Sequence, residues 1–418
     1  MLIPAPAHAD TQAGIEWTQQ TAAVDRDWQA VAFGNGLFVA LANAGSTNKV
    51  MTSPDGVTWT ARAVTDDVYW RSLVYGNGRF VAVGAVGSNS RAMFSIDGIT
   101  WTPATPPPAR EWTSVAYGDN KFVAVAKQGY VMTSSDGSSW AETAIANEWS
   151  GITFANNQFV AVAQSGTNRV MTSPNGITWT PRAAASASTS SWASITYGNG
   201  TFVATAWDGA DRVMTSVDGI TWTPRTATST SSQWLSVTFG GGLFVAVSRD
   251  APAPGRVMTS PDGATWTARD AASAKQWLGV AFGNNTFVAV AVFAGLDGVM
   301  SSAGSVSPAQ SAPSDAPIFS LTFDSMPGFE ISGGIGSWVT LPTPATPSAS
   351  SPNSTFLGWA TYEGFPVQIA QRQVSNGWGA YEVFNDDGSM RGVSIPAGGA
   401  ACIAAPEPMY PVWSAPSA

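Results

Sequence analysis

The phrase Ser53-Pro54-Asp55-Gly56-Val57-Thr58-Trp59 recurs with small changes as far as Trp266. Its acidic or amide position is occupied in successive copies by Asp55, Asp97, Asp136, Asn175, Asp218 and Asp262. The closing tryptophans form one ladder: Trp59, Trp101, Trp140, Trp179, Trp222 and Trp266. A second ladder interleaves with it: Trp28, Trp70, Trp112, Trp149, Trp192, Trp234 and Trp277. Steps within each ladder are 37 to 44 residues, which is the period of a four-stranded propeller blade.

The two ladders differ in length by one member, so one of the seven blades lacks its last strand. The missing piece has a match near the start of the chain, where Gly14-Ile15-Glu16-Trp17-Thr18 reads like Gly56-Val57-Thr58-Trp59-Thr60. With Trp17, fourteen of the nineteen tryptophans follow the repeat. The sequence therefore predicts an all-β fold, a seven-bladed β-propeller that is closed by its N-terminal strand.

The first repeat shows how one blade is built. Residues 28–33 alternate and predict the first strand, and Gly34-Asn35-Gly36 predicts a tight turn, since Asn and Gly tolerate positive φ. Residues 37–42 are nearly all apolar, as expected for a strand buried between neighbouring blades. Residues 49–53 begin the third strand, and an Asp-Gly turn leads into a fourth strand over 57–60.

The repeated Asp or Asn is expected to accept hydrogen bonds from the amides of its own turn, while the Gly takes a left-handed conformation. The Trp that follows is expected to pack against the next sheet. Because these residues recur once per blade, we assign them a structural role.

The repeat resembles the Asp-box (sialidase-type) propeller repeat, Ser-x-Asp-x-Gly-x-Thr-Trp, with one residue fewer between Asp and Trp. The resemblance covers residues 14–302, and it implies a turn that holds the fold far from any active site. The shorter variant also resembles repeats of phage tail and bacterial surface proteins.

Two kinds of loop connect the strands. The short Gly-Asn-Gly and Asp-Gly turns form one uniform face, and the longer, variable loops must meet on the opposite face, where binding usually resides. One variable loop carries Trp207 between the second and third strands of its blade, with Asp208 and Asp211 beside it, and another ends at Tyr69. An aromatic ring beside acidic groups predicts a sugar platform; the alternative is that Trp207 packs over its own loop.

A cationic pattern also follows the repeat. Each of the first six repeats has a Met in its third strand. The residues two positions before this Met are Lys49, Arg91, Tyr130, Arg169, Arg212 and Arg256. The functional interpretation is a partial ring that attracts anionic polymers such as charged cell-wall glycans. The alternative is that these side chains end solvated strands and cover apolar surface with their stems.

The repeat stops after residue 302. We assign 1–13 as an N-terminal tail, 14–302 as the propeller, 303–317 as a Pro/Ser/Ala linker and 318–418 as a small β-rich domain. Four phrases of the last segment, beginning at Leu321, Val339, Phe356 and Met409, resemble the Listeria–Bacteroides (internalin B-repeat) module. That resemblance implies a β-grasp-like fold and a spacer or adhesion role.

Composition narrows the classes of function. The net charge of −9 without a basic cluster argues against nucleic-acid binding. No apolar run reaches membrane-spanning length. The single cysteine, Cys402, and the single histidine, His8, provide neither a disulfide framework nor a zinc site. We expect no metal, no cofactor and no catalytic residues. A nucleophilic triad usually needs a histidine near its nucleophile, and His8 lies in the N-terminal tail. The arginine set of sialidases is absent as well.

The lead hypothesis is a non-enzymatic binding or structural protein of a virion, on a phage tail or capsid surface. Its variable loops would recognise a host-envelope glycan or a partner protein, so the expected partners are other virion or cell-surface proteins. The alternatives are a secreted, extracellular bacterial adhesin and a sialidase-like glycoside hydrolase.

Overall fold

The structure is a computed structural model. Of the N-terminal part it describes residues 12–304, except 44–46, 65–67, 86–90, 106–108, 186–189 and 251–254. Beyond residue 304 it describes the backbone of short strands only. The chain divides into two compact units, Met1–Ser305 and Val306–Ala418, and each is described by itself.

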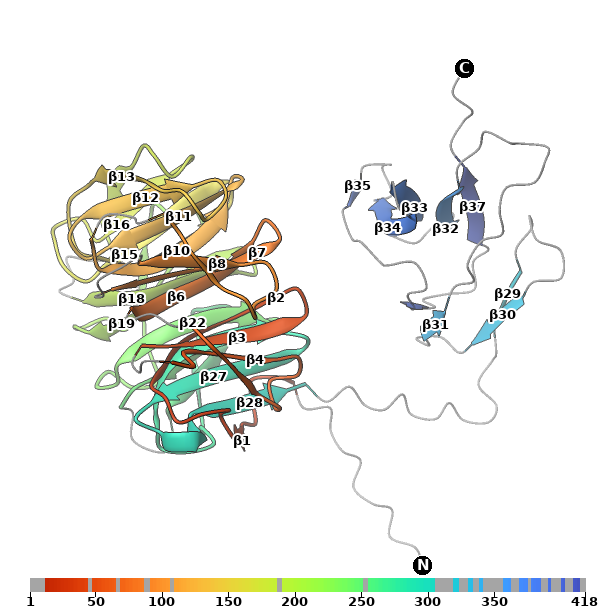
Figure 1. Ribbon diagram of the computed structural model, residues 1–418. Coiled ribbons are helices and arrows are strands. Elements are labelled where there is room, and N and C mark those ends of the chain that lie inside the picture. The colour runs from red at the N-terminus through yellow and green to blue at the C-terminus, as the bar shows by residue number, and fades with distance from the viewer. Residues whose placement is uncertain are drawn as a thin grey trace, which may run out of the picture. The chain divides into compact units, whose positions relative to one another are not determined.

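The first unit contains seven sheets of four antiparallel strands, which confirms the seven-bladed propeller (Figure 1). The innermost strands are β2 (Trp28–Gly34), β6 (Tyr69–Gly76), β10 (Trp112–Gly118), β14 (Trp149–Ala155), β18 (Ser191–Gly198), β22 (Trp234–Gly240) and β26 (Gln276–Gly283). The second strands are β3 (Leu37–Ala42), β7 (Arg79–Ala85), β11 (Lys121–Ala126), β15 (Gln158–Ala163), β19 (Thr201–Asp208), β23 (Leu243–Ser248) and β27 (Thr286–Val292).

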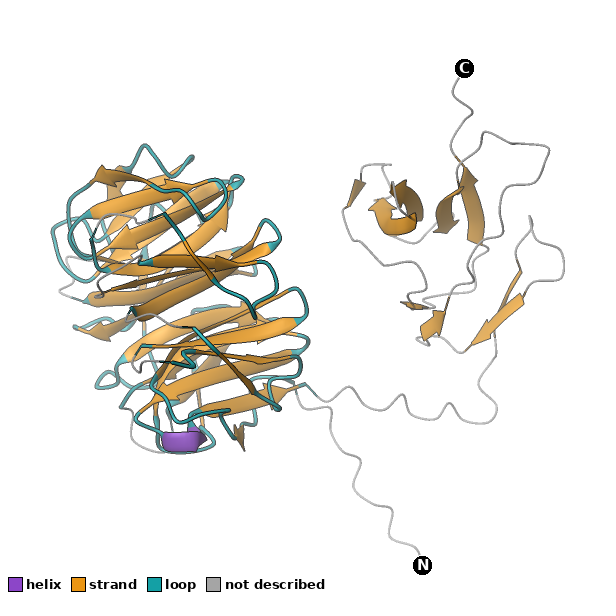
Figure 2. Cartoon of the chain, viewed as in Figure 1, coloured by secondary structure: helices purple, strands orange, loops and turns teal. Residues whose placement is uncertain are grey.

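The third strands are β4 (Val50–Ser53), β8 (Ala92–Ser95), β12 (Tyr130–Ser134), β16 (Val170–Ser173), β20 (Val213–Ser216), β24 (Val257–Ser260) and β28 (Val299–Ala303). The outermost strands are β5 (Thr60–Arg62), β9 (Thr102–Pro103), β13 (Ala141–Ala144), β17 (Thr180–Arg182), β21 (Thr223–Arg225), β25 (Thr267–Arg269) and β1 (Thr18–Gln20). Figure 2 shows strands and turns throughout this unit, with one short 3-10 helix, η1 (Gly295–Asp297), among its described residues. No helix in the described part of the chain has the length and apolarity needed to cross a bilayer.

The second strand of each blade forms the core. In β3, Phe38 to Ala42 are all buried, because both faces of this strand are covered by neighbouring blades. The predicted strand over 37–42 is confirmed, and so is the tight turn, in which Asn35 and Gly36 have φ of 49° and 73°. The predicted fourth strand over 57–60 is wrong: residues 57 and 58 belong to the turn, and β5 begins at Thr60.

The turn Ser53–Trp59 and its copies, here called the Asp turns, explain that displacement. Asp55 Oδ1 accepts the N–H groups of Val57 and Thr58 at 2.8 and 2.9 Å, which holds these two amides away from a strand partner. The Gly56 N–H donates to Ser53 Oγ at 2.8 Å, and the indole of Trp59 donates to the Gly56 carbonyl at 3.2 Å. The predicted capping of the turn by its own Asp is therefore confirmed in geometry.

Each Asp turn packs on the blade before it. A Cβ on Gly56 would lie 2.5 Å from Val288 of β27, and one on Gly98 would lie 2.9 Å from Val39 of β3. Trp59 belongs to the same buried cluster as Val288. The expectation that this Trp packs against the next sheet is wrong in direction, since the sheet that it meets is that of the preceding blade.

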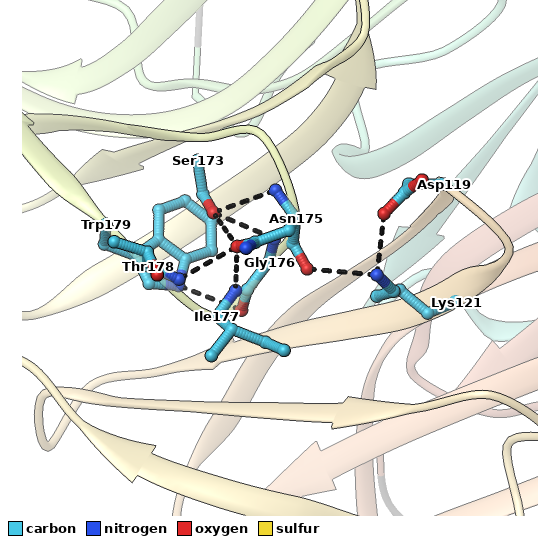
Figure 3. Close-up of polar contacts among 8 residues, drawn as sticks. All are labelled: Asp119, Lys121, Ser173, Asn175, Gly176, Ile177, Thr178 and Trp179. Atoms are coloured by element: carbon cyan, nitrogen blue, oxygen red, sulfur yellow. Dashed lines mark hydrogen bonds and ion pairs between the residues drawn. The ribbon is translucent and has the colours of Figure 1, made fainter.

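The hairpin between the first and second strands reaches the following blade's Asp turn. Lys121 Nζ, at the start of β11, donates to the Asn175 carbonyl at 3.3 Å and pairs with Asp119 at 2.6 Å (Figure 3). The Gln158 amide donates in the same way to the Asp218 carbonyl at 2.7 Å. The hairpins and the Asp turns thus share one face, the Asp-turn face, and the longer loops share the opposite one, the variable face.

The N-terminal strand closes the ring, as predicted. β1 pairs with β28 in the register Thr18↔Ser301 to Gln20↔Val299 and completes the seventh sheet. A split Asp turn precedes it: the Gly14 N–H donates to Ser302 Oγ at 2.8 Å, and Trp17 donates to the Gly14 carbonyl at 3.1 Å. These two bonds repeat the Gly56–Ser53 and Trp59–Gly56 contacts, with serine and glycine 288 residues apart.

The second unit is described by its strands, which are β29 (Phe319–Thr322), β30 (Glu330–Gly333), β31 (Trp338–Thr340), β32 (Phe356–Thr361), β33 (Gln368–Val374), β34 (Gly377–Phe384), β35 (Met390–Arg391), β36 (Ala400–Cys402) and β37 (Met409–Trp413). They pair as β29–β30, β31–β36, β32–β37 and β33–β34–β35. The β-grasp-like fold and the Listeria–Bacteroides resemblance stay predictions. Residues 1–11, most of the predicted tail, lie outside the described residues.

Deleting residues 1–20 should open the seventh blade, because it removes β1 and the Trp17 side chain packed on the core. We expect a loss of about 3–5 kcal/mol in the free energy of unfolding and a melting temperature lower by roughly 10 °C. The matched control is deletion of residues 1–11, which should leave the melting temperature unchanged. Equal melting temperatures for the two truncations would contradict closure by β1.

The Asp turns should make the ring sensitive to acid. The N–H of Thr221 holds the pKa of Asp218 below its usual range; burial opposes this, and the N–H of Ile220 and the hydroxyl of Ser216 add to it. A carboxylate whose pKa is lower in the folded state stabilises the folded protein at pH values above its unfolded pKa, about 3.9. That stabilisation is lost as the pH falls through the folded pKa.

Asp218→Asn should therefore be less stable than wild type by about 1 kcal/mol at pH 7, with a difference that shrinks towards pH 3. Asn already fits this position in the fourth turn, where Asn175 Oδ1 accepts the Ile177 N–H at 2.9 Å. The reverse change, Asn175→Asp, should steepen the fall of stability in acid. Urea denaturation between pH 3 and 7 measures both, and parallel curves for all three proteins would refute the role of the charge.

Candidate functional site

A cavity of about 540 Å³ occupies the centre of the ring. Its wall comes from the innermost strand of every blade, at the positions just after the first-ladder tryptophan. At this point each strand has a β-bulge, for example between Trp28 and Ala30 of β2 and between Trp70 and Ser72 of β6. A bulge leaves its extra residue without a ladder partner, so that residue is available to line the channel.

The two sides of the wall differ in chemistry. The bulged residues of the first four blades are polar: Gln29, Arg71, Thr113 and Ser150. Those of the last three blades are apolar: Ala193, Leu235 and Leu278. The channel therefore has a polar arc over blades one to four and an apolar arc over blades five to seven.

Hydroxyl groups connect neighbouring blades around the channel. The Val115 N–H donates to Ser72 Oγ at 3.1 Å, and the Ile152 N–H donates to Ser114 Oγ at 3.2 Å. Ser194 and Ser236 accept the Val237 and Val280 amides in the same way. The equivalent positions of the other three blades hold residues without a hydroxyl, Ala30, Gly151 and Gly279.

Cations rim the mouth of the channel on the variable face. Arg71, Lys127 and Arg249 line it and are exposed, and no Asp or Glu is among the described lining residues. The two arginines contact neutral amides: Arg71 Nη1 lies 3.5 Å from Gln29 Oε1, and Arg249 Nε lies 2.8 Å from Gln276 Oε1. The Lys127 ammonium group is 4.0 Å from the Glu111 carboxylate.

Phe293 projects at the same rim. Its side chain is 72% exposed, and its backbone has φ of +51°, a conformation that bulky residues rarely adopt. The Phe293 N–H donates to Asp27 Oδ1 at 2.8 Å, which helps to hold this conformation. Residues held in sparsely populated backbone conformations cluster at functional sites.

The predicted cationic ring lies on the variable face, and each of its five cations, unlike Tyr130, donates to a carbonyl of the loop leading to the next blade. Lys49 is 0% exposed and donates to the Val68 carbonyl at 3.0 Å. Arg212 is 8% exposed and donates to Thr230 at 2.7 Å. The remaining pairs are Arg91 with Arg110, Arg169 with Ser190 and Arg256 with Lys275. These bonds tie the loops of the variable face together; ligand binding by these cations stays a prediction.

The aromatic candidates lie away from the channel lining. The Tyr130 ring is covered by the Arg110 guanidinium, 3.6 Å from its centroid, and Arg110 pairs with Glu142 at 3.1 Å. Tyr69 begins β6 and is exposed, after residues 65–67, which lie outside the described residues.

Trp207 is half-buried at the end of β19. Asp208 is exposed, accepts the Gly209 N–H at 2.8 Å and lies 3.9 Å from Arg212 Nη1. The Asp211 N–H donates to Ser190 Oγ at 3.0 Å. The three residues thus lie on one loop, as predicted. Among the described residues, no group of three or more His, Cys, Asp or Glu side chains could hold a metal ion. Their role in sugar binding stays a prediction.

Sequence reasoning missed the channel residues, although the sequence carries a signal for them. The residue directly after each first-ladder Trp changes from blade to blade while its neighbours repeat. A variable position inside a regular strand indicates a surface that packing does not dictate.

Comparisons with known proteins support the fold. Residues 71–182 match the DUF6242 beta propeller domain. A streptogramin B lyase structure is similar over 70% of this chain and 99% of that one, with 11% identity and a TM-score of 0.59. So is a catalytically inactive histidine-to-alanine variant of virginiamycin B lyase from Staphylococcus aureus with quinupristin, over 69% and 98%, with 9% identity and a TM-score of 0.59.

The structure of YCF48 bound to D1 peptide is similar over 74% of this chain and 100% of that one, with 16% identity and a TM-score of 0.53. At these identities the likeness shows the propeller fold alone. No curated protein sequence matches the chain.

Replacing the buried Lys49 tests the loop ties. Lys49→Ala should lower the free energy of unfolding by about 1–3 kcal/mol, because the buried hydrogen bond from the Lys49 ammonium group to the Val68 carbonyl is lost. Lys127→Ala is the control, since that exposed side chain should change stability by less than about 0.5 kcal/mol. Urea denaturation measures both, and equal effects would show that Lys49 does not stabilise the loops.

Proposed function

We propose that this chain is a non-catalytic recognition protein whose propeller binds its target at the mouth of the central channel, on the variable face. The observation that carries the proposal is the asymmetric channel wall, with three exposed cations and an exposed, strained Phe293 at one rim. A cavity of about 540 Å³ lies within the size range of ligand sites. Regular propeller packing does not require Arg71, Lys127, Arg249 and Phe293 at this rim, so a ligand accounts best for these four side chains.

Two features support binding without catalysis. The described lining has no carboxylate, whereas glycoside hydrolysis uses a pair of them across the sugar. The similar virginiamycin B lyase is catalytically inactive in its histidine-to-alanine form, and this chain has one histidine, His8, outside the described residues. These features favour a binding protein over a sialidase-like hydrolase or a lyase.

The setting that we propose is a virion surface, on a phage tail or capsid, with host-envelope components or neighbouring virion proteins as partners. The support is the resemblance of the repeat to those of phage tail and bacterial surface proteins. The second setting is a secreted bacterial adhesin, which the resemblance of residues 318–418 to a bacterial surface module favours. The recognition surface is the same in both.

The test is binding of fluorescently labelled full-length protein to intact bacterial cells, purified envelope polysaccharides and purified virion proteins. Saturable binding should weaken at least about tenfold in Arg249→Gln combined with Phe293→Ser, since both side chains are exposed at the mouth. Arg182→Gln, on the outermost strand β17, is the matched control and should bind like wild type. Unchanged binding by the double variant would show that the recognition surface is not the channel mouth. Absence of binding to every target would reject the proposal.

A further inference from the structure

We propose that the central channel binds a peptide segment in which a carboxylate stands beside a bulky apolar side chain. The inference rests on the recognition function proposed above and names the ligand class of the same site. Three properties of the channel lead to it, namely the charge of its mouth, the chemistry of its apolar arc and the backbone groups at its inner edge.

The mouth selects for an anion. The whole chain carries a net charge of −9, yet the charged residues of the described lining are Arg71, Lys127 and Arg249. The Asp27 carboxylate lies outside this lining, where it accepts the Phe293 N–H. The guanidinium of Arg71 uses one contact of 3.5 Å to Gln29, so its planar fork keeps donors for a carboxylate. The Glu111 side chain, 41% exposed and 4.0 Å from Lys127 Nζ, lies outside the lining, so it competes weakly for that ammonium group.

The apolar arc selects for a hydrophobic group next to that anion. Leu235 and Leu278 are half-buried in the wall, and Phe293 lines the same cavity and is exposed. Covering these side chains with an apolar group removes their surface from water, at roughly 25 cal/mol per Å². Cations on the mouth and leucines on one wall together fit an amphipathic ligand better than a uniformly charged one.

Backbone groups at the inner edge add a third preference. Four inner-strand amides donate to a serine of the preceding blade, as the Val115 N–H does to Ser72. Val31, Leu73 and Ile195 occupy the same place in the other three blades, where the preceding blade presents Gly279, Ala30 and Gly151. No serine hydroxyl reaches these three amides. Peptide carbonyl groups are suitable acceptors for such edge N–H groups.

An acidic polysaccharide fits less well. It supplies carboxylates for Arg71 and Lys127, but it has no bulky apolar side chain to cover Leu235, Leu278 and Phe293. A peptide supplies the carboxylate, the apolar group and the carbonyl acceptors in one segment. The observations therefore favour the peptide, and the polysaccharide becomes an alternative outcome of the test.

The experiment exposes immobilised full-length protein to a library of free hexapeptides randomised at all positions, and sequences the retained peptides by mass spectrometry. Retained peptides should be enriched in Asp, Glu or the terminal carboxylate next to Leu, Ile, Phe or Met. Arg71→Gln combined with Lys127→Gln should remove the acidic preference, and Phe293→Ser should weaken the apolar one. Arg182→Gln should leave both unchanged.

Fluorescence anisotropy with the most enriched peptide, labelled with fluorescein, gives the size of the effect. The double replacement should raise Kd at least roughly tenfold, and binding to wild type should weaken as sodium chloride rises from 50 to 500 mM, since salt screens exposed charges. Unchanged melting temperatures show that the variants keep the fold.

No enrichment, or the same enrichment in the double variant, would overturn the peptide channel. If labelled oligogalacturonate binds instead and loses affinity in the double variant, the channel takes an acidic glycan and the inference is wrong. If cells or virion proteins still bind through Arg249 and Phe293 while peptides are not enriched, the recognition function stands and this inference alone fails. Absence of binding in every assay rejects both.

Discussion

The arrangement of the blades depends on closure of the ring, in which β1 pairs with β28 and the Gly14 N–H donates to Ser302 Oγ at 2.8 Å. Each sheet covers the apolar face of its neighbour, so an incomplete seventh sheet would expose the sides of the sixth and first blades. The contact repeats one made in every other blade between residues three apart, such as Ser53 and Gly56. Closure thus needs no special chemistry, because an ordinary repeat unit is divided between the first and the last strand of the propeller.

Most of the fold could be predicted from the sequence, because its determinants are local and repeated. The Trp ladders gave the number of blades, and the match of Gly14–Thr18 to Gly56–Thr60 gave the closing strand. The start of the outermost strand was misplaced, since alternation of apolar residues does not reveal that Asp55 binds the amides of Val57 and Thr58. The prediction that Trp59 packs on the next blade was also wrong. A periodic sequence does not show whether a side chain contacts the preceding or the following blade of the ring.

The candidate site could be predicted only in part. The variable face follows from strand alternation, and it is the face on which the channel opens. Lys49 and the arginines at its equivalent positions are visible in the sequence because they repeat. In the structure these cations donate to loop carbonyls, as Lys49 does to Val68. The channel residues do not repeat, so only the three-dimensional arrangement of the blades brings Arg71 and Leu278, on inner strands, to one cavity with Phe293, which follows β27.

The seam between β1 and β28 also has a mechanical consequence. Thr18 opposes Ser301 while Gln20 opposes Val299, so the chain enters β1 and leaves β28 at the same end of the pair. A force pulling residue 12 away from residue 304 would load the pair at that end and break its hydrogen bonds one after another, as in unzipping. Shearing would load all of them at once. Tension applied through residues 12 and 304 should therefore open the ring at a lower force than tension applied along the strands in a shearing direction.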